Sequence, residues 1–464
     1  SHFSLFLSTA DRMCKLFAGN CSSLLGILVD TCIRALRSPH TDAGTEEGQR
    51  VESAKDESLR ILLFWMQSKV IFAPHAQEVS KLMIELLETE KDTDKTNKIV
   101  WNISDLLCCM DAVGGSAAMR RMWIEYWNIL KRLIKEEKHT TLCIKTLICC
   151  INVMDDEVLS VDEVKEIGVM MKEQLERELR RRETENNAII NEQMEKPGGL
   201  LNEIICIINP LYDTVGAQIC QIMHPLMPII FKLIEKCSDK HWGVRVPTHL
   251  ILRVPDFALQ YYDQIVALLD RSLTDSRPMV RQWAARAYRV MAVSNNPVWI
   301  GVAVSMVDPL CRLIYRDDAR RGGEYTLATE AAIASIVDIV KNCGELVGDG
   351  KINEILASFL DWLPITGTRA TIIYGFLVDL IEDYNMAILG EPNAKRPKLI
   401  SVLTKAINED IFDRDGESQS VKRRVIIIIK AMAEDNSFFE CARRADLNLD
   451  EVSTLARILH SSIP

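Results

Sequence analysis

The sequence predicts an all-α fold, an α-solenoid in which helix pairs stack into a superhelical arch. A pair of amphipathic helices joined by a polar turn recurs along the chain, and its clearest copy spans residues 261–293. There an apolar helix ends at the turn 274–278, and Val280-Arg281 then begins a second helix rich in alanine. Two such helices cannot bury their apolar faces alone, so they must stack on neighbouring pairs. Strands are not expected, because no convincing apolar–polar alternation with a period of two occurs.

The spacing of the pairs identifies the repeat type. After a helix at 3–18, we expect about nine helix pairs and a terminal cap at 437–461. The second helices are expected to begin near residues 53, 94, 140, 198, 240, 277, 325, 368 and 419. Successive starts lie 37–58 residues apart, and these distances centre on the roughly 40–47 residues of HEAT and armadillo repeats. The expected divisions are HEAT repeats at 1–160, a repeat with a long charged helix at 161–214, HEAT repeats at 215–434 and a carboxy-terminal helical cap at 435–464.

Three segments differ from the regular pattern. Residues 38–57 are polar and contain glycine, which predicts a mobile loop within an incomplete first repeat. Residues 161–196 are too long for one repeat helix, and their mixed charges at helical spacing predict an exposed helix stabilised by neighbouring ion pairs. The run 425–429 is β-branched but lies between basic, helix-forming residues, so we interpret it as a buried helix.

The composition indicates the cellular compartment of the protein and argues against a membrane or secreted protein. The chain has 464 residues, 48% of them hydrophobic, which suffices for a continuous core. No apolar run reaches the roughly 18 residues of a membrane span, and the charged residues within 3–17 argue against a signal peptide. The first residue is not Met, so we expect the chain to be part of a longer protein. The 14 cysteines lack zinc-ligand spacing, which indicates buried, reduced thiols in a cytosolic or nuclear protein.

Charge and motifs favour protein binding over catalysis. The net charge of −10 repels nucleic acid and attracts basic partners, so we expect no direct nucleic-acid contact and no membrane insertion. The eight histidines form no triad or metal pattern, and no GxGxxG or P-loop occurs, so we expect neither an enzyme nor a cofactor. The basic clusters 395–398 and 422–424 are interpreted as solvated helix ends.

Ordered motifs in the second half resemble the karyopherin-β (importin-β) family. The resemblance is good over roughly 200–410 and weaker before 160, and the long charged helix also matches in position. The matching stretches, in the order found in the family, are Trp242-Gly243, PMVRQWAARAYRVMA from Pro278, ATEAAIASIVDIVK from Ala328, Trp362-Leu363-Pro364, FLVDLIE from Phe376 and Ile388-Leu389-Gly390.

This resemblance implies a monomeric nuclear import receptor that shuttles between cytoplasm and nucleus. Such receptors bind cargo proteins with basic segments on the concave face, release them when Ran-GTP binds, and contact Phe-Gly nucleoporins on the outer face. If the chain is the carboxy-terminal half, the family's main Ran site in the amino-terminal repeats is missing from it. The family's acidic insertion after the long helix is also absent here, since residues 186–199 are short and nearly neutral, so no role of that insertion can be transferred.

Acidic residues on second helices are the candidate cargo contacts, because those helices line the concave face of HEAT arches. Asp379, Glu382 and Asp383 share one side of a helix, and a solvated acidic face is the alternative. Asp361 beside an exposed Trp362 could hold a lysine by charge and cation–π contact, unless the ring is packed in the core.

Two further groups complete the set of candidates. Asp155, Asp156 and Glu157 follow a predicted helix end and are either a third acidic cluster or a polar turn. Asp275 and Arg281 are expected instead to form a structural ladder between the turns of successive repeats.

A second function fits the same fold. HEAT repeats also form structural scaffolds, such as a phosphatase regulatory subunit or a chromosome-organising protein. Such a scaffold would have a fixed partner and no response to Ran, and near-identical repeats would favour it. The uneven spacing of the second helices argues mildly against it.

Overall fold

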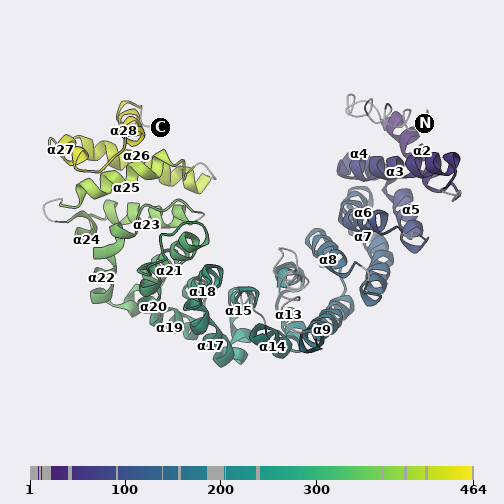
Figure 1. The fold of residues 1–464 in the computed structure, drawn as a ribbon, viewed down its shortest axis with the longest axis horizontal. Helices are drawn as coiled ribbons and strands as arrows, with labels where there is room; N and C mark the ends of the chain where they lie inside the picture. The colour runs from purple at the N-terminus through teal and green to yellow at the C-terminus, as the bar shows by residue number, and fades with distance from the viewer. Residues whose placement is uncertain are drawn as a thin grey trace. The chain divides into compact units, whose positions relative to one another are not determined.

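The described residues of the chain fold into helices (Figure 1). The chain divides into two compact units, residues Ser1–Asp239 and Lys240–Pro464. The computed structural model describes residues 9, 12, 22–39, 44–89, 92–137, 139–154, 158–184, 203, 205–236, 241–367, 369–390, 394–412 and 416–461. No strand occurs among these described residues, and the helices pack in pairs, which confirms the all-α solenoid.

The first unit alternates first and second helices of the expected pairs. The first helices of successive pairs are α2 (Ser22–Leu36), α5 (Ala76–Thr89), the second half of α7 (Ile103–Lys135) and α9 (Val161–Thr184). Helix α5 follows the short segments α4 (Lys69–Phe72) and η1 (Ala73–His75). The last first helix of this unit consists of η2 (Gly216–Gln218), α13 (Ile219–Met223) and α14 (Met227–Lys236). The second helices are α3 (Glu46–Met66), α6 (Thr93–Trp101) with the first half of α7, α8 (Thr140–Val153) and α12 (Ile208–Val215).

In the second unit the second helices stack side by side in one layer. This second-helix layer comprises α15 (His241–Arg253), α18 (Pro278–Ala292), α21 (Glu324–Val347), α23 (Ala370–Glu382) and α26 (Gly416–Ala433), each in contact with the next. The first helices are α16 (Pro255–Ala258) with η3 (Leu259–Tyr261) and α17 (Tyr262–Leu273), α19 (Pro297–Ser305) with α20 (Val307–Ile314), α22 (Asp349–Phe359) with η4 (Leu360–Trp362), and α24 (Met386–Leu389) with α25 (Arg396–Asn408). Helices α27 (Phe438–Arg443) and α28 (Leu449–His460) follow them.

The boundary between the units falls between Asp239 and Lys240, at the second-helix start expected near residue 240. Helix α14 packs against α9, whereas α15 packs against α18, so these two members of one expected pair belong to different units. Several expected starts of second helices agree with the structure: α8, α15, α18 and α21 begin within about one residue of the expected positions. The start expected near 198 lies outside the described residues.

The turn ladder expected at Asp275 and Arg281 is present. The Arg281 side chain is only 1% exposed, and its Nη1 donates to the main-chain oxygens of Asp275 and Ser276 at 2.9 and 2.8 Å. Its Nη2 donates to Asp318 Oδ2 at 3.1 Å, in the turn of the next pair. One buried guanidinium thus joins two successive turns, while the Asp275 carboxylate holds Arg277 at 3.0 Å.

Helix α7 joins two pairs across a kink. Its backbone departs from helical geometry at Gly114 and at Gly115, where φ is 61° and ψ is −162°. Residues with a Cβ atom do not adopt this combination, so the kink depends on glycine. The first half of α7 therefore completes one pair, and the second half begins the next.

The loop predicted at 38–57 is wrong over most of its length. Helix α3 already begins at Glu46, where the Thr45 side chain accepts a hydrogen bond from the Gly48 amide at 3.0 Å. Glu46 and Glu47 lie in the first turn, where negative charge interacts favourably with the helix dipole. Residues 46–57 are polar because they lie on a helix surface.

The charged segment is helical as α9 through Thr184, but the expectation of an exposed helix is wrong for one of its faces. Val164, Ile167 and Leu175 are buried, because α9 packs against α13 and α14. Residues 185–196 and most of the expected helix at 3–18 lie outside the described residues. The β-branched run belongs to α26, with Val425, Ile428 and Ile429 buried. In the described part no single helix is long and apolar enough to cross a membrane, although two bent helix pairs reach that composition together.

Candidate functional site: a groove along helix α3

The predicted acidic trio lies at the end of α23 and is largely bound to cations of the chain itself. Asp379 contacts Lys341 of α21 at 3.2 Å and Arg424 of α26 at 2.8 Å. Glu382 contacts the same Arg424 at 2.5 Å. Burial would raise the pKa of Asp379, but hydrogen bonds from Arg424 and Lys341 lower it below its ordinary value. A basic ligand would have to compete with these two cations.

The third member of the trio differs from the other two. Asp383 caps the end of α23, and its amide donates to the Asp379 carbonyl at 3.0 Å. The residue is exposed. Of the predicted trio, it is the carboxylate most open to an external cation.

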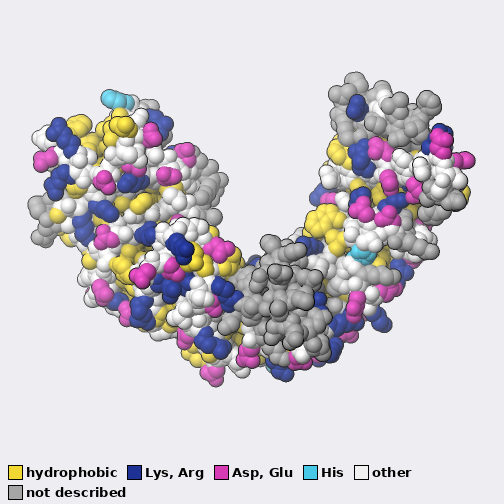
Figure 2. Space-filling view, viewed as in Figure 1, with side chains coloured by type: hydrophobic (Ala, Val, Ile, Leu, Met, Phe, Trp, Pro, Cys, Tyr) yellow, Lys and Arg dark blue, Asp and Glu magenta, His cyan; other side chains and the backbone are white. Residues whose placement is uncertain are grey.

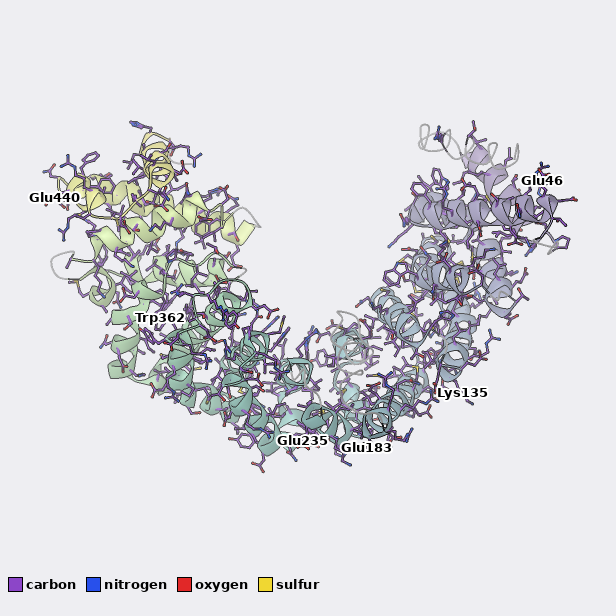
Figure 3. The ribbon with its side chains drawn as sticks, viewed as in Figure 1. Glu46, Lys135, Glu183, Glu235, Trp362 and Glu440 are labelled. Atoms are coloured by element: carbon purple, nitrogen blue, oxygen red, sulfur yellow. The ribbon has the colours of Figure 1, made fainter. Side chains whose placement is uncertain are left out.

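The expectation of an exposed Trp362 is wrong. Trp362 lies among the helices of the second unit (Figure 3). The residue is 2% exposed, and its indole N–H donates to the Tyr315 hydroxyl at 3.0 Å. Phe359 packs edge-on at a centroid distance of 5.8 Å. The 3₁₀ turn η4 directs the ring into the core, whereas its neighbour Asp361 is exposed. The two side chains therefore cannot hold one lysine together.

The third predicted cluster cannot be compared with the structure. Asp155, Asp156 and Glu157 lie outside the described residues, between Met154 and Val158. They remain a prediction.

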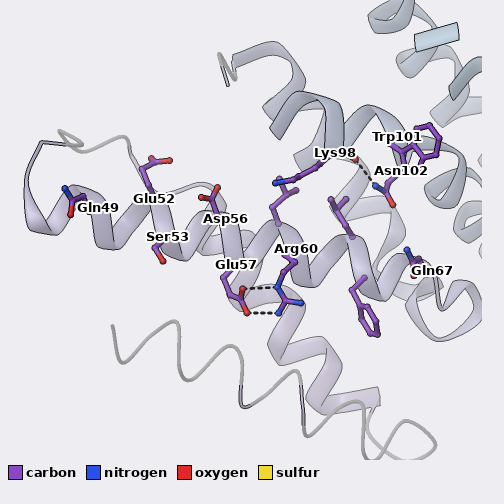
Figure 4. A pocket seen from close by; sticks show the side chains of 13 residues that line it. Gln49, Glu52, Ser53, Asp56, Glu57, Arg60, Gln67, Lys98, Trp101 and Asn102 are labelled. Carbon is purple, nitrogen blue, oxygen red and sulfur yellow. Dashed lines mark hydrogen bonds and ion pairs between the residues drawn. The ribbon is translucent and has the colours of Figure 1, made fainter. Parts of the chain in front are cut away.

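The structure instead reveals a groove of about 850 Å³ along α3 (Figure 4). One wall is α3, and the other is formed by the last turn of α6 and the residue after it. The lining residues are Gln49, Glu52, Ser53, Asp56, Glu57, Leu59, Arg60, Leu63, Phe64, Gln67, Lys98, Trp101 and Asn102. These belong to second helices of two successive pairs.

The two ends of this α3 groove differ in chemistry. Glu52 and Asp56 lie toward the beginning of α3, and Trp101 and Gln67 lie toward its end (Figure 4). Trp101 is 53% exposed and Phe64 is 38% exposed, which is unusual for large aromatic side chains in a packed helical protein. The groove therefore has a charged end and an aromatic end.

The charges at the first end are partly balanced. Lys95 Nζ lies 2.8 Å from Glu52 Oε2 and 3.2 Å from Asp56 Oδ1. The hydrogen bond from Lys95 lowers the pKa of Glu52. The Asp56 side chain nevertheless remains 61% exposed. Asp56 can accept a second cation from solvent because most of its carboxylate surface is open.

The middle of the groove is fixed by a bidentate ion pair. Arg60 donates from Nε and Nη2 to the two oxygens of Glu57, at 2.9 and 2.7 Å. This geometry holds both side chains in one orientation. The pair thus separates the charged end from the aromatic end.

Sequence reasoning missed this site because residues 46–57 were expected to form a loop. A signal was present, since lining residues recur along α3 at helical spacing: 49, 52, 53, 56, 57, 60, 63, 64 and 67. A helix assignment would have put them on one face. The exposure of Trp101, however, depends on how α6 packs, which no local pattern encodes.

No family model matches the chain. Its helices do superpose on solved karyopherin structures. The karyopherin Kap121p bound to the SUMO protease Ulp1p is 17% identical with a TM-score of 0.72, over 97% of this chain and 44% of that one. Kap121p bound to RanGTP is 16% identical with a TM-score of 0.73, and Kap121p bound to Nup53p is 16% identical with a TM-score of 0.71, each over the same shares. The chain has the fold of a karyopherin HEAT-repeat solenoid and spans less than half the length of these proteins.

Proposed function

We propose that this chain is part of a nuclear transport receptor that binds protein cargo along its second helices. The karyopherin fold and the ordered family motifs support this proposal. Within the family, those motifs most resemble importin-five, also called karyopherin beta three. The receptor would work by binding rather than catalysis and would move between cytoplasm and nucleus.

The partners of the neighbours indicate which kinds of partner to test. Kap121p has been solved with RanGTP, with Nup53p and with the proteins Ulp1p, Ste12p and Pho4p. We propose Ran, nucleoporins and basic cargo segments as partners of the complete receptor. Of these partners, the cargo segment is the one for which we propose a site in this chain.

The α3 groove is the observation that carries the proposal. From Gln49 to Gln67 the groove follows α3 for about 27 Å, at 1.5 Å per helical residue. An extended peptide of about eight residues spans that length. We propose that its basic residues lie against Glu52 and Asp56, and that an apolar or lysine side chain lies on Trp101 and Phe64.

The energetics require several such contacts. One exposed ion pair contributes about 0–1 kcal/mol, and one cation–π contact contributes about 0.5–2 kcal/mol. Micromolar affinity needs about 8 kcal/mol. A peptide with basic residues at one end and an apolar side chain at the other would use both ends of the groove.

Fluorescence anisotropy with a labelled lysine-rich peptide tests this site. We expect micromolar binding that weakens with salt, because surface charges are screened. Trp101→Ala should weaken binding roughly 2- to 30-fold through loss of the ring contact. Asp56→Lys should weaken it roughly fivefold or more by replacing attraction with repulsion.

Matched controls lie on α7 in the same unit. Ile124 is 43% exposed and Glu125 is exposed, so Ile124→Ala and Glu125→Lys repeat the two changes away from the groove. Both should leave the affinity unchanged. Equal losses in groove and control variants would refute the site. Loss only in the triple variant Asp379→Lys, Glu382→Lys, Asp383→Lys would move the cargo site to the acidic trio.

A further inference from the structure

Basic side chains of the second unit gather around one tryptophan of the second-helix layer, Trp283. Figure 2 shows dark blue Lys and Arg side chains over the region of α18 and α21. The residues of this arginine cluster are Arg245, His249 and Arg253 of α15, Trp283, Arg286 and Arg289 of α18, and Arg369 immediately before α23.

Trp283 orders two of the guanidinium groups. The Arg245 guanidinium carbon lies 4.9 Å from the centroid of the indole ring, and that of Arg286 lies 4.7 Å from it. A guanidinium in contact with a ring keeps its N–H edges available for a carboxylate or phosphate. The Arg286 guanidinium is therefore held on the ring in an orientation that can accept an anion.

The cluster is partly buried, and its charges repel one another. Burial, and then the charges of Arg369, Arg289 and Arg245, lower the pKa of Arg286 to about 10. Burial and the nearby charge of Arg289 also lower the pKa of Arg369. Such repulsion is unfavourable in the free protein and is relieved when an anion binds.

Among the described residues, Asp338 compensates part of the positive charge of the cluster. Asp338 of α21 forms an ion pair with Arg289. In the described part of the chain, no carboxylate lies within ion-pair distance of Arg286 or Arg369.

We propose that the arginine cluster binds an acidic segment of a partner protein, with carboxylates on Arg286 and Arg369. A short peptide fits better than nucleic acid for two reasons. The chain has a net charge of −10, which opposes a long polyanion. Further along the same layer the surface carries Asp379 and Glu382, so the basic area does not continue as a phosphate track. This site is separate from the α3 groove and has the opposite charge preference.

The test uses the full 464-residue chain and a fluorescein-labelled glutamate-rich peptide. We expect saturable binding, and a loss of at least about tenfold in affinity for the double variant Arg286→Glu, Arg369→Glu, because each reversal replaces attraction with repulsion. The matched control is Arg271→Glu, Arg312→Glu, which makes the same change in net charge at exposed arginines of α17 and α20. This control variant should bind the peptide with the affinity of the parent chain.

Further measurements keep the proposal open to refutation. The charge-preserving variant Arg286→Lys, Arg369→Lys should retain part of the affinity, whereas circular dichroism should show the same helix content in all variants. An affinity within twofold of the parent for the double glutamate variant would overturn the proposal. A single-stranded oligonucleotide of equal charge that binds more tightly than the peptide would also overturn it, in favour of a nucleic-acid site.

Discussion

His249 shows how neighbours set the charge of one residue. The imidazole is partly buried in α15, and burial, followed by the charges of Arg245, Arg286 and Arg253, lowers its pKa to about 4. The folded protein therefore keeps His249 neutral in a range where the unfolded chain, with a histidine pKa of about 6.5, binds a proton. Stability from this residue is complete above pH 6.5 and is lost as the pH falls toward 4.

This difference predicts an acid-sensitive second unit. Between pH 7.5 and pH 5, protonation of the unfolded state at His249 should lower the free energy of unfolding by about 1–2 kcal/mol. Urea unfolding at the two pH values measures this change in the free energy of unfolding. His249→Gln should reduce the difference between the two values, whereas His460→Gln at an exposed position should not. An unchanged pH difference in His249→Gln would contradict the assignment.

Arg281 is a buried charged residue whose role is structural. Its three hydrogen bonds join two turns, and the side chain is almost fully buried. Arg281→Met should lower the free energy of unfolding by about 2–4 kcal/mol, because two carbonyls and Asp318 lose a buried donor. Denaturant unfolding measures this. Arg277→Ala, at a 37% exposed side chain beside it, should cost about 0–1 kcal/mol. An equal loss of stability in the two variants would mean that the contribution of Arg281 does not depend on its burial.

The structural role of a residue could be predicted from the sequence where that role depends on the turn that contains the residue. The Asp275 and Arg281 ladder follows from their positions at a turn and a helix start. The choice between Trp362 and Trp101 could not be made in this way. Both stand near acidic residues in the sequence, yet the first is 2% and the second 53% exposed. Their exposure is set by packing between helices that are distant in sequence, and one sequence does not contain that geometry.

At the scale of helices, the kink in α7 depends on a single glycine. Gly115 has φ of 61° and ψ of −162°, and an added Cβ would find open space there. The strain is therefore in the backbone and not in a clash with neighbours. Gly115→Ala should lower the free energy of unfolding by about 1–3 kcal/mol.

A glycine in ordinary helical geometry provides the control. Gly301 lies in α19 with open space around its Cβ position. Gly301→Ala should raise stability by about 0.5–1 kcal/mol, since alanine favours helix. Thermal unfolding of the two variants should shift in opposite directions. A stabilised Gly115→Ala variant would show that the kink can straighten without cost.

Helix boundaries were predictable where turns are short and polar. The starts of α15, α18 and α21 follow from proline and polar turn residues just before an apolar face. The start of α3 was missed because its first turns are solvent-exposed and carry no apolar stripe. Its helix is stabilised locally by the Thr45 cap and the acidic first turn, signals weaker than apolar periodicity.

At the scale of the whole chain, stability is distributed along a line of helix pairs. In the second unit each member of the second-helix layer contacts the next, and the chain divides into two units that each have many internal contacts. The repeating pairs were predictable from sequence because each repeat encodes its own apolar faces. The position of the division was not, because it depends on which neighbour each helix contacts.

This linear organisation predicts that a destabilising change acts locally. In a solenoid each repeat interacts with its neighbours, so lost free energy is confined to nearby repeats. Hydrogen exchange measured by mass spectrometry should show faster exchange in α5–α8 for Gly115→Ala, with α18–α26 unchanged. Arg281→Met should produce the reverse, with faster exchange in α17–α21 and no change in α3–α8. Uniformly faster hydrogen exchange over both units in either variant would show that the chain unfolds as one cooperative body. A destabilising change in either unit would then lower the stability of both proposed binding surfaces.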